Sequence, residues 1–206
     1  MFSPRVYFRQ IETYNLALWP LQILTLLVGV GLVCLLARAR PNASRIVAMV
    51  LAALWLLVGW AYLWSHFSSI NWAATYAAYG FVAQAILILV IQVIPRRTGA
   101  SLPGGFAGVV VMAVAVLLYP GLSLIAGRGP ETSEVFGIMP DPTAIATIGF
   151  LASTRQRYDV LLFVIPTLWC VVSTITLFTM GDSIWWVPLS MCLAGLSLAI
   201  DKRRGA

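Results

Sequence analysis

Long apolar runs alternate along this chain with short clusters of charged residues. Six of the runs contain no Asp, Glu, Lys or Arg, and the length of each falls within the roughly 17–25 residues that a helix needs to cross a bilayer. They cover residues 17–37, 46–67, 73–94, 105–126, 160–180 and 184–200. This pattern predicts an all-α bundle of transmembrane helices.

A shorter apolar stretch, 141–154, lies between the fourth and fifth long runs. If it also crosses, ten basic residues lie on one side of the membrane and only Arg5, Arg9 and Arg128 lie on the other. The best arrangement with six crossings divides the basic residues eight to five. Because cytoplasmic loops are enriched in Lys and Arg, we expect seven crossings, an external N-terminus and a basic cytoplasmic tail over 201–206.

Residues 1–16 precede the first long run. Ser3 followed by Pro4 is typical of a helix start, and apolar residues then recur at helical spacing from Val6 to Tyr14. We expect an amphipathic helix that lies on the outer surface of the bilayer. A straight extension of the first transmembrane helix is the alternative.

Aromatic residues gather near the expected outer ends of the helices. Indole and phenol rings favour the headgroup region of a bilayer, so these residues predict an outer aromatic rim. Its members are Trp19, Trp64, Trp72, Tyr119, Trp185 and Trp186.

Composition supports the membrane assignment. The chain is 61% hydrophobic and only 10% charged, whereas soluble domains carry about 25% charged residues. The net charge of +6 does not indicate nucleic acid as a partner, because the basic residues lie in short clusters between apolar runs. The expected partner is the lipid bilayer.

The sequence Pro140-Asp141-Pro142 opens the short stretch and predicts a broken membrane element. Pro142 disfavours a helical conformation at Asp141, so Asp141 is expected to be the N-cap of a half-helix that starts there. Non-helical backbone at membrane depth must be buried in protein or line a watery cavity. We therefore predict an outward-facing substrate pocket formed by Glu134, Asp141, Thr143 and Thr147. The alternative is that Asp141 only caps a short helix and that Glu134 lies in a hydrated surface loop.

Other polar residues within or beside the runs are secondary candidates for this pocket. Gln22 and Gln84 are expected to form hydrogen bonds between helices, and His66 and Asn71 lie near an outer helix end. Pro120 and Pro166 interrupt two of the long runs, so each is expected to bend its helix.

The sequence argues against an enzyme. It contains one histidine and one lysine, and it lacks the P-loop, HExxH and nucleophile-elbow motifs. The three cysteines lie singly in apolar runs and do not suggest a metal site. We expect no cofactor and no metal.

The chain resembles a group of bacterial multi-pass membrane proteins known only as a domain of unknown function. The resemblance rests on 14–22 (YNLALWPLQ), 70–74 (INWAA), 134–147 (EVFGIMPDPTAIAT) and 166–170 (PTLWC). It implies the cytoplasmic (inner) membrane of a bacterium as the location and implies no substrate.

Two functional hypotheses follow. The first is a small-solute or cation transporter or channel, with the pocket at the broken fifth segment. The second is a non-catalytic accessory subunit that docks on a larger membrane complex through its aromatic rim. Either protein could form a homo-oligomer.

Overall fold

The computed structural model describes residues 3–39, 42–94, 105–154 and 159–204. The structure is 81% helical. The described residues form no strands, and an isolated bridge joins Phe136 to Met139 in the irregular segment before α7. The predicted all-α class is confirmed.

Helices follow one another along the chain with short connections. The first half contains α1 (Pro4–Ala17), α2 (Leu21–Ala37), α3 (Ala43–Leu57), the π-helix η1 (Val58–Trp64), the 3₁₀ turn η2 (Phe67–Ser69), α4 (Ala73–Ile88) and the π-helix η3 (Leu89–Val93). The second half contains α5 (Phe106–Leu117), η4 (Tyr119–Gly121), α6 (Leu122–Ile125), η5 (Pro130–Thr132), α7 (Pro140–Ser153), α8 (Asp159–Thr179) and α9 (Val187–Arg204).

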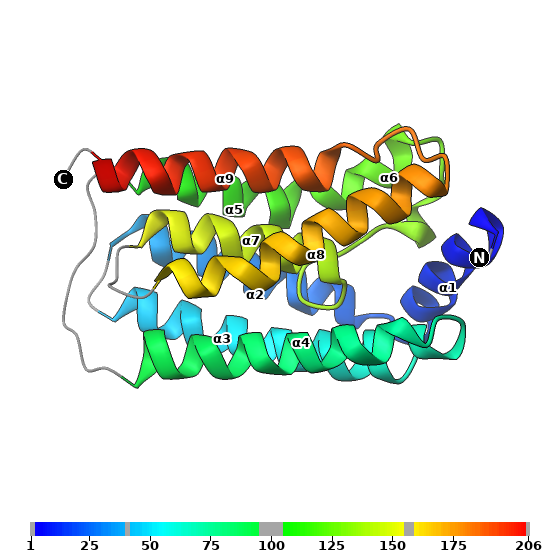
Figure 1. The fold of residues 1–206 in the computed structure, drawn as a ribbon, viewed down its shortest axis with the longest axis horizontal. Helices are drawn as coiled ribbons and strands as arrows, with labels where there is room; N and C mark the ends of the chain where they lie inside the picture. The colour runs from blue at the N-terminus through cyan, green and yellow to red at the C-terminus, as the bar shows by residue number, and fades with distance from the viewer. Residues whose placement is uncertain (1–2, 40–41, 95–104, 155–158, 205–206) are drawn as a thin grey trace.

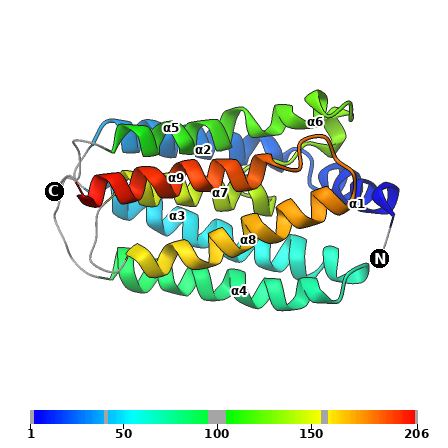
Figure 2. The same ribbon diagram turned by 45° about the horizontal axis from the view of Figure 1, so that its top comes forward.

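The long helices lie side by side along one axis (Figures 1 and 2). Successive members of the series α2, α3, α4, α5, α7, α8 and α9 run in opposite directions along that axis. The two chain ends lie at opposite ends of the bundle, and α1 lies across the end that holds the N-terminus.

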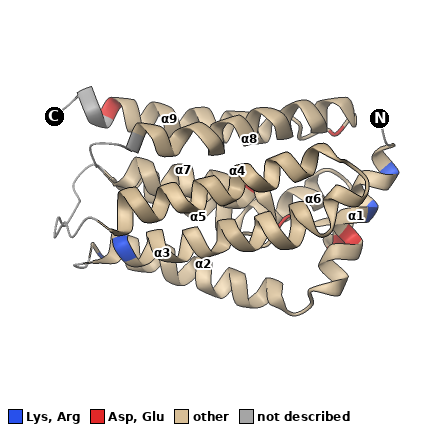
Figure 3. Ribbon diagram, turned by 60° about the horizontal axis from the view of Figure 1, so that its bottom comes forward, with Lys and Arg blue, Asp and Glu red and all other residues tan. Residues whose placement is uncertain are grey.

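Several helices are long and apolar enough to cross a membrane. Among the described residues, three qualify individually, namely Ala43–Ser69, Ala73–Val93 and Val160–Thr179, and the number rises to five if two bent pairs each form one span. Figure 3 shows that most charged segments lie towards the two ends of the bundle, with the long helices largely free of charge between them. The part of the chain that the structure describes thus contains three to five candidate membrane-spanning helices.

The N-terminal helix is a separate element. Ser3 is its N-cap and accepts a hydrogen bond from the N–H of Val6, with Pro4 at the first helical position. The axes of α1 and α2 differ by 87°, so α1 is not a straight extension of α2. One face of α1, which includes Tyr7 and Ile11, is buried against the bundle.

The two proline-containing runs behave differently. At Pro120 the helix is interrupted by η4, and the segments on either side differ in direction by 42°. At Pro166, by contrast, α8 continues as a single helix. The helix is therefore bent and interrupted at Pro120, as expected, whereas α8 is uninterrupted at Pro166.

At the centre of the bundle lies α7, and all 14 of its residues are buried. It packs against α3, α5, α8 and α9. Its closest neighbour is α5, where two glycines allow the backbones to meet. A Cβ atom on Gly108 would lie 2.5 Å from the Ser153 nitrogen, and one on Gly149 would lie 2.5 Å from the Met112 nitrogen.

Because the backbones of α5 and α7 touch, we expect that one methyl group added between them lowers the stability of the fold. Gly149→Ala should destabilise the fold by about 1–3 kcal/mol, because the two backbones must move apart. Gly80→Ala is the matched control, since its Cβ would meet no atom within 4 Å and alanine favours a helix. Thermal unfolding of the purified protein in detergent measures both, and equal melting temperatures for the two variants would contradict this packing.

Candidate functional site

The segment before α7 is non-helical and buried. Val135, Phe136, Ile138 and Met139 are each at most 5% exposed. Gly137 adopts a positive φ of 83°, and a Cβ there would meet side chains of α2 and α3. The amides of residues 138 and 139 both donate to the carbonyl of residue 135. Protein therefore surrounds this irregular backbone on all the sides that these contacts define.

The helix begins two residues earlier than the sequence predicts. It starts at Pro140, and Met139 is its N-cap residue, without a side-chain capping bond. Two prolines in the first turn cost little, because the first N–H groups of a helix have no partner within the helix. The expectation that Asp141 is the N-cap is therefore wrong: Asp141 lies within the first turn.

Thr143 and Thr147 hold the start of α7 together and do not line the cavity described below. The Thr143 hydroxyl accepts from the Gly137 N–H at 2.9 Å and donates to the Met139 carbonyl at 2.7 Å. The Thr147 hydroxyl donates to the Thr143 carbonyl at 2.8 Å and accepts from the Trp55 indole at 2.9 Å. Both side chains are fully buried.

The Asp141 carboxylate accepts hydrogen bonds from two neighbouring elements. The Tyr119 hydroxyl in η4 donates to Oδ2 at 3.0 Å. On α8, the Trp169 indole donates to Oδ1 at 2.7 Å and the Ser173 hydroxyl donates to Oδ2. Asp141 is only 4% exposed, so these donors take the place of water around the carboxylate.

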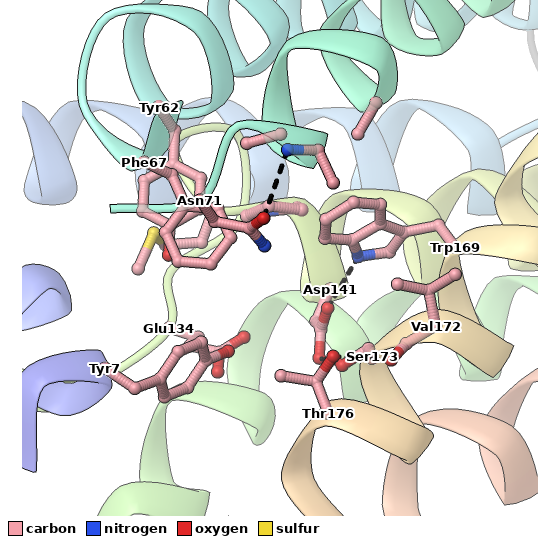
Figure 4. A pocket seen from close by; sticks show the side chains of 15 residues that line it. Tyr7, Tyr62, Phe67, Asn71, Glu134, Asp141, Trp169, Val172, Ser173 and Thr176 are labelled. Carbon is pink, nitrogen blue, oxygen red and sulfur yellow. Dashed lines mark hydrogen bonds between the residues drawn. The ribbon is translucent and has the colours of Figure 1, made fainter. Parts of the chain in front are cut away.

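A cavity of about 90 Å³ adjoins this carboxylate, near the bundle end that carries α1. Asp141 and Glu134 both line it, together with side chains from α1, η1, η2, α4 and α8 (Figure 4). The remaining lining residues are Tyr7, Tyr62, Phe67, Asn71, Ala73, Ala74, Ala77, Met139, Pro140, Trp169, Val172, Ser173 and Thr176.

Glu134 is buried and does not lie in a hydrated surface loop, since only 9% of it is exposed. Burial raises the pKa of the Glu134 carboxyl well above its ordinary value, and the nearby Asp141 raises it further. The positive charge of Arg128 lowers the pKa of Glu134. The Arg128 guanidinium itself pairs with Asp182 and lies 4.2 Å from the centre of the Phe8 ring.

Of the secondary candidates, only Asn71 lines the cavity. Gln84 donates to the Leu162 carbonyl at 2.9 Å and thereby joins α4 to α8. The Gln22 amide donates to the Asn15 carbonyl at 2.6 Å, across the break between α1 and α2. His66 lies 2.9 Å from the carbonyl oxygen of Gln10, a hydrogen bond that attaches η2 to α1.

Sequence reasoning missed the three donors to Asp141. Tyr119 was expected in the outer aromatic rim, but it is 4% exposed and faces the bundle interior. The rim tryptophans Trp19, Trp64, Trp72, Trp185 and Trp186 are exposed. Trp169 and Ser173 are four residues apart, which places them on one face of a helix. That spacing was the available signal, but only the fold shows that the face points towards Asp141.

The site is thus a buried pair of carboxylates with aromatic neighbours, set in an all-helical protein with helices suited to a membrane. Among the described residues, no three His, Cys, Asp or Glu side chains come together to hold a metal ion. Residues 4–206 match the family of unknown function DUF6064, and the chain belongs to that family. No curated protein and no solved structure matches the chain.

The hydroxyl of Thr143 should be needed for the start of α7. Thr143→Val leaves the Gly137 N–H without an acceptor, so the free energy of unfolding should fall by about 1–3 kcal/mol. Thr143→Ser should retain most of the stability. Thr176→Val is the matched control, because its hydroxyl donates only to the Val172 carbonyl in its own helix. Chemical unfolding followed by tryptophan fluorescence tests this, and a loss as large in Thr176→Val would refute the assignment.

Proposed function

We propose that this protein is an integral membrane transporter or channel for a small solute or cation, with its binding site at the Glu134–Asp141 cavity. The observation that carries the proposal is the presence of two buried carboxylates on one cavity, beside a helix that starts inside the bundle. Ionisable groups in the interior of a membrane protein commonly mark substrate or ion pathways. Discontinuous helices that begin near such groups are a recurring feature of transporter sites.

The proposed topology has seven crossings formed by α2, α3, α4, α5 with α6, α7, α8 and α9. The alternating directions of these helices support it. The described Arg38 and Arg45 flank the turn between α2 and α3, at the end opposite α1. The other basic residues assigned to the cytoplasm between helices, Arg40, Arg96, Arg97, Arg155 and Arg157, lie outside the described residues. This topology gives an external N-terminus and a cytoplasmic C-terminus in a bacterial inner membrane.

The proposed site faces outward, towards the end of the bundle that α1 covers. Tyr7 of α1 lines the cavity, and α1 is attached there by polar contacts. The Asn15 amide donates to the carbonyls of Glu131 and Ser133, both at 2.8 Å. In the seven-crossing topology, a solute from outside would therefore approach past α1.

An accessory subunit of a larger complex is the second candidate function. Its support is an exposed group of aromatic side chains on η1 and α4, with Trp60, Trp64, Trp72, Tyr76 and Tyr79 each at least 39% exposed. Aromatic residues are enriched at protein interfaces and also at membrane surfaces. Purification in a mild detergent distinguishes the two functions, because an accessory subunit should carry a stoichiometric partner and a transporter should not need one.

Loss of either carboxylate should stop transport. Glu134→Gln in proteoliposomes should reduce flux by about 100-fold or more, because it removes the charge available to the solute. Asp141→Asn should reduce flux as strongly, because its carboxylate lines the same cavity and holds the first turn of α7 in place. Isotope flux of rubidium, sodium and methylammonium measures this. The matched control is Glu131→Gln, since Glu131 is exposed and near Glu134 in sequence. Full activity of the two site variants, or no flux of any of the three ions through the wild type, would contradict the proposal.

The seventh crossing has a separate test. A reporter enzyme fused after Arg157 should read as cytoplasmic, because α7 carries the chain from the outer to the inner side. A fusion after Arg128 should read as external. If both fusions report the same side, α7 does not cross the membrane.

A further inference from the structure

The cavity beside Glu134 has aromatic walls. Tyr62 and Phe67 stack with ring centres 5.6 Å apart, and Tyr7 meets Phe67 edge-on at 6.0 Å. Trp169 closes the side nearest Asp141 (Figure 4). The faces of aromatic rings carry partial negative charge and attract cations. A cation in this cavity would therefore gain from the walls as well as from the carboxylates.

The two carboxylates differ in the number of hydrogen-bond donors that the protein supplies to them. Asp141 accepts three hydrogen bonds from protein side chains. Glu134 accepts none from the residues that the structure describes, although it is nine-tenths buried and lines the cavity (Figure 4). A buried carboxylate without donors is unfavourable. A ligand in the cavity can supply the hydrogen-bond donors that Glu134 lacks.

Arg128 does not fill that role. It is the cation with the strongest effect on Glu134, but its guanidinium pairs with Asp182 and lies over the Phe8 ring. It is also not among the residues that line the cavity. The side of Glu134 that faces the cavity is left for a ligand.

We propose that the cavity binds a small protonated amine. The ammonium group donates N–H hydrogen bonds to Glu134, and its alkyl group lies against the rings of Tyr62, Phe67 and Trp169. The inference deepens the proposed transport function by naming the substrate class, and as transport it rests on that function. A volume of about 90 Å³ holds only a few water molecules, so the amine is of the size of methylammonium.

Other cations fit the same cavity less well. A quaternary ammonium ion would gain from the rings but has no N–H to donate to Glu134. Alkali and alkaline-earth ions prefer a shell of several oxygen ligands, whereas most of this wall is aromatic or aliphatic. A protonated amine can both donate hydrogen bonds to Glu134 and lie against the aromatic rings.

The experiment is a titration of the purified full-length protein in nanodiscs with methylammonium, tetramethylammonium and sodium chlorides, followed by calorimetry and thermal shift. Methylammonium should bind at least about tenfold more tightly than the other two. Glu134→Gln should weaken methylammonium binding by about tenfold or more. Glu131→Gln should bind as the wild type does.

A second variant covers the case in which Glu134→Gln fails to fold. Phe67→Leu removes one ring without changing charge, and it should weaken methylammonium binding by about two- to fivefold with little effect on sodium. Equal affinities for methylammonium and sodium in the wild type, or tighter binding of tetramethylammonium, would overturn the inference.

The failures of the two proposals are distinguishable. Rubidium flux without methylammonium binding would overturn the amine and leave the transport function standing. Methylammonium binding without flux of any tested ion would overturn the transport function and leave the amine site standing.

Discussion

The interaction on which this structure depends is the attachment of α7 through the Asp141 carboxylate. Tyr119 and Ser173 donate to one of its oxygens and Trp169 to the other, so one buried group connects α7 to η4 and α8. Hydrogen bonds to a charged group are roughly twice as strong as neutral ones. Removal of one partner would leave a polar group unsatisfied in the interior. The position of the central helix thus depends on polar chemistry as well as on apolar packing.

Two further contacts make this arrangement possible. Gly108 and Gly149 let α5 and α7 approach until their backbones touch. The Thr143 hydroxyl bonds to both sides of the turn at Gly137 that leads into α7. The helix can then begin within the bundle, where its first turn borders a cavity. Asp141 serves mainly as the anchor at that cavity, and Glu134 is the carboxylate that remains available to a ligand.

Much of the fold follows from the sequence, because helices in apolar surroundings need long uncharged runs. The helical segments were visible in this way. Ser3 and Pro4 indicated the N-terminal helix, with a straight extension of the next helix as the alternative, and Pro120 indicated a bend. The site was only partly visible. Glu134 and Asp141 stood out as acids beside an apolar stretch, whereas Tyr119 looked like an interfacial aromatic residue. Its hydrogen-bond partner, Asp141, is 22 residues away in sequence. Local sequence patterns do not indicate which sides of two helices pack together. The π-helices η1 and η3 lie within apolar runs whose hydrophobic pattern does not distinguish them from α-helix.

The most direct test of the account is a double-mutant cycle between Tyr119 and Asp141. The free energies of unfolding of Tyr119→Phe, Asp141→Ala and the double variant are compared with that of the wild type, in one detergent and at one pH. If Asp141 anchors α7 through the Tyr119 hydroxyl, the double variant should lose about 1–3 kcal/mol less than the sum of the single losses. Losses that add to within about 0.5 kcal/mol would show that the hydroxyl and the carboxylate act independently, and would contradict the account.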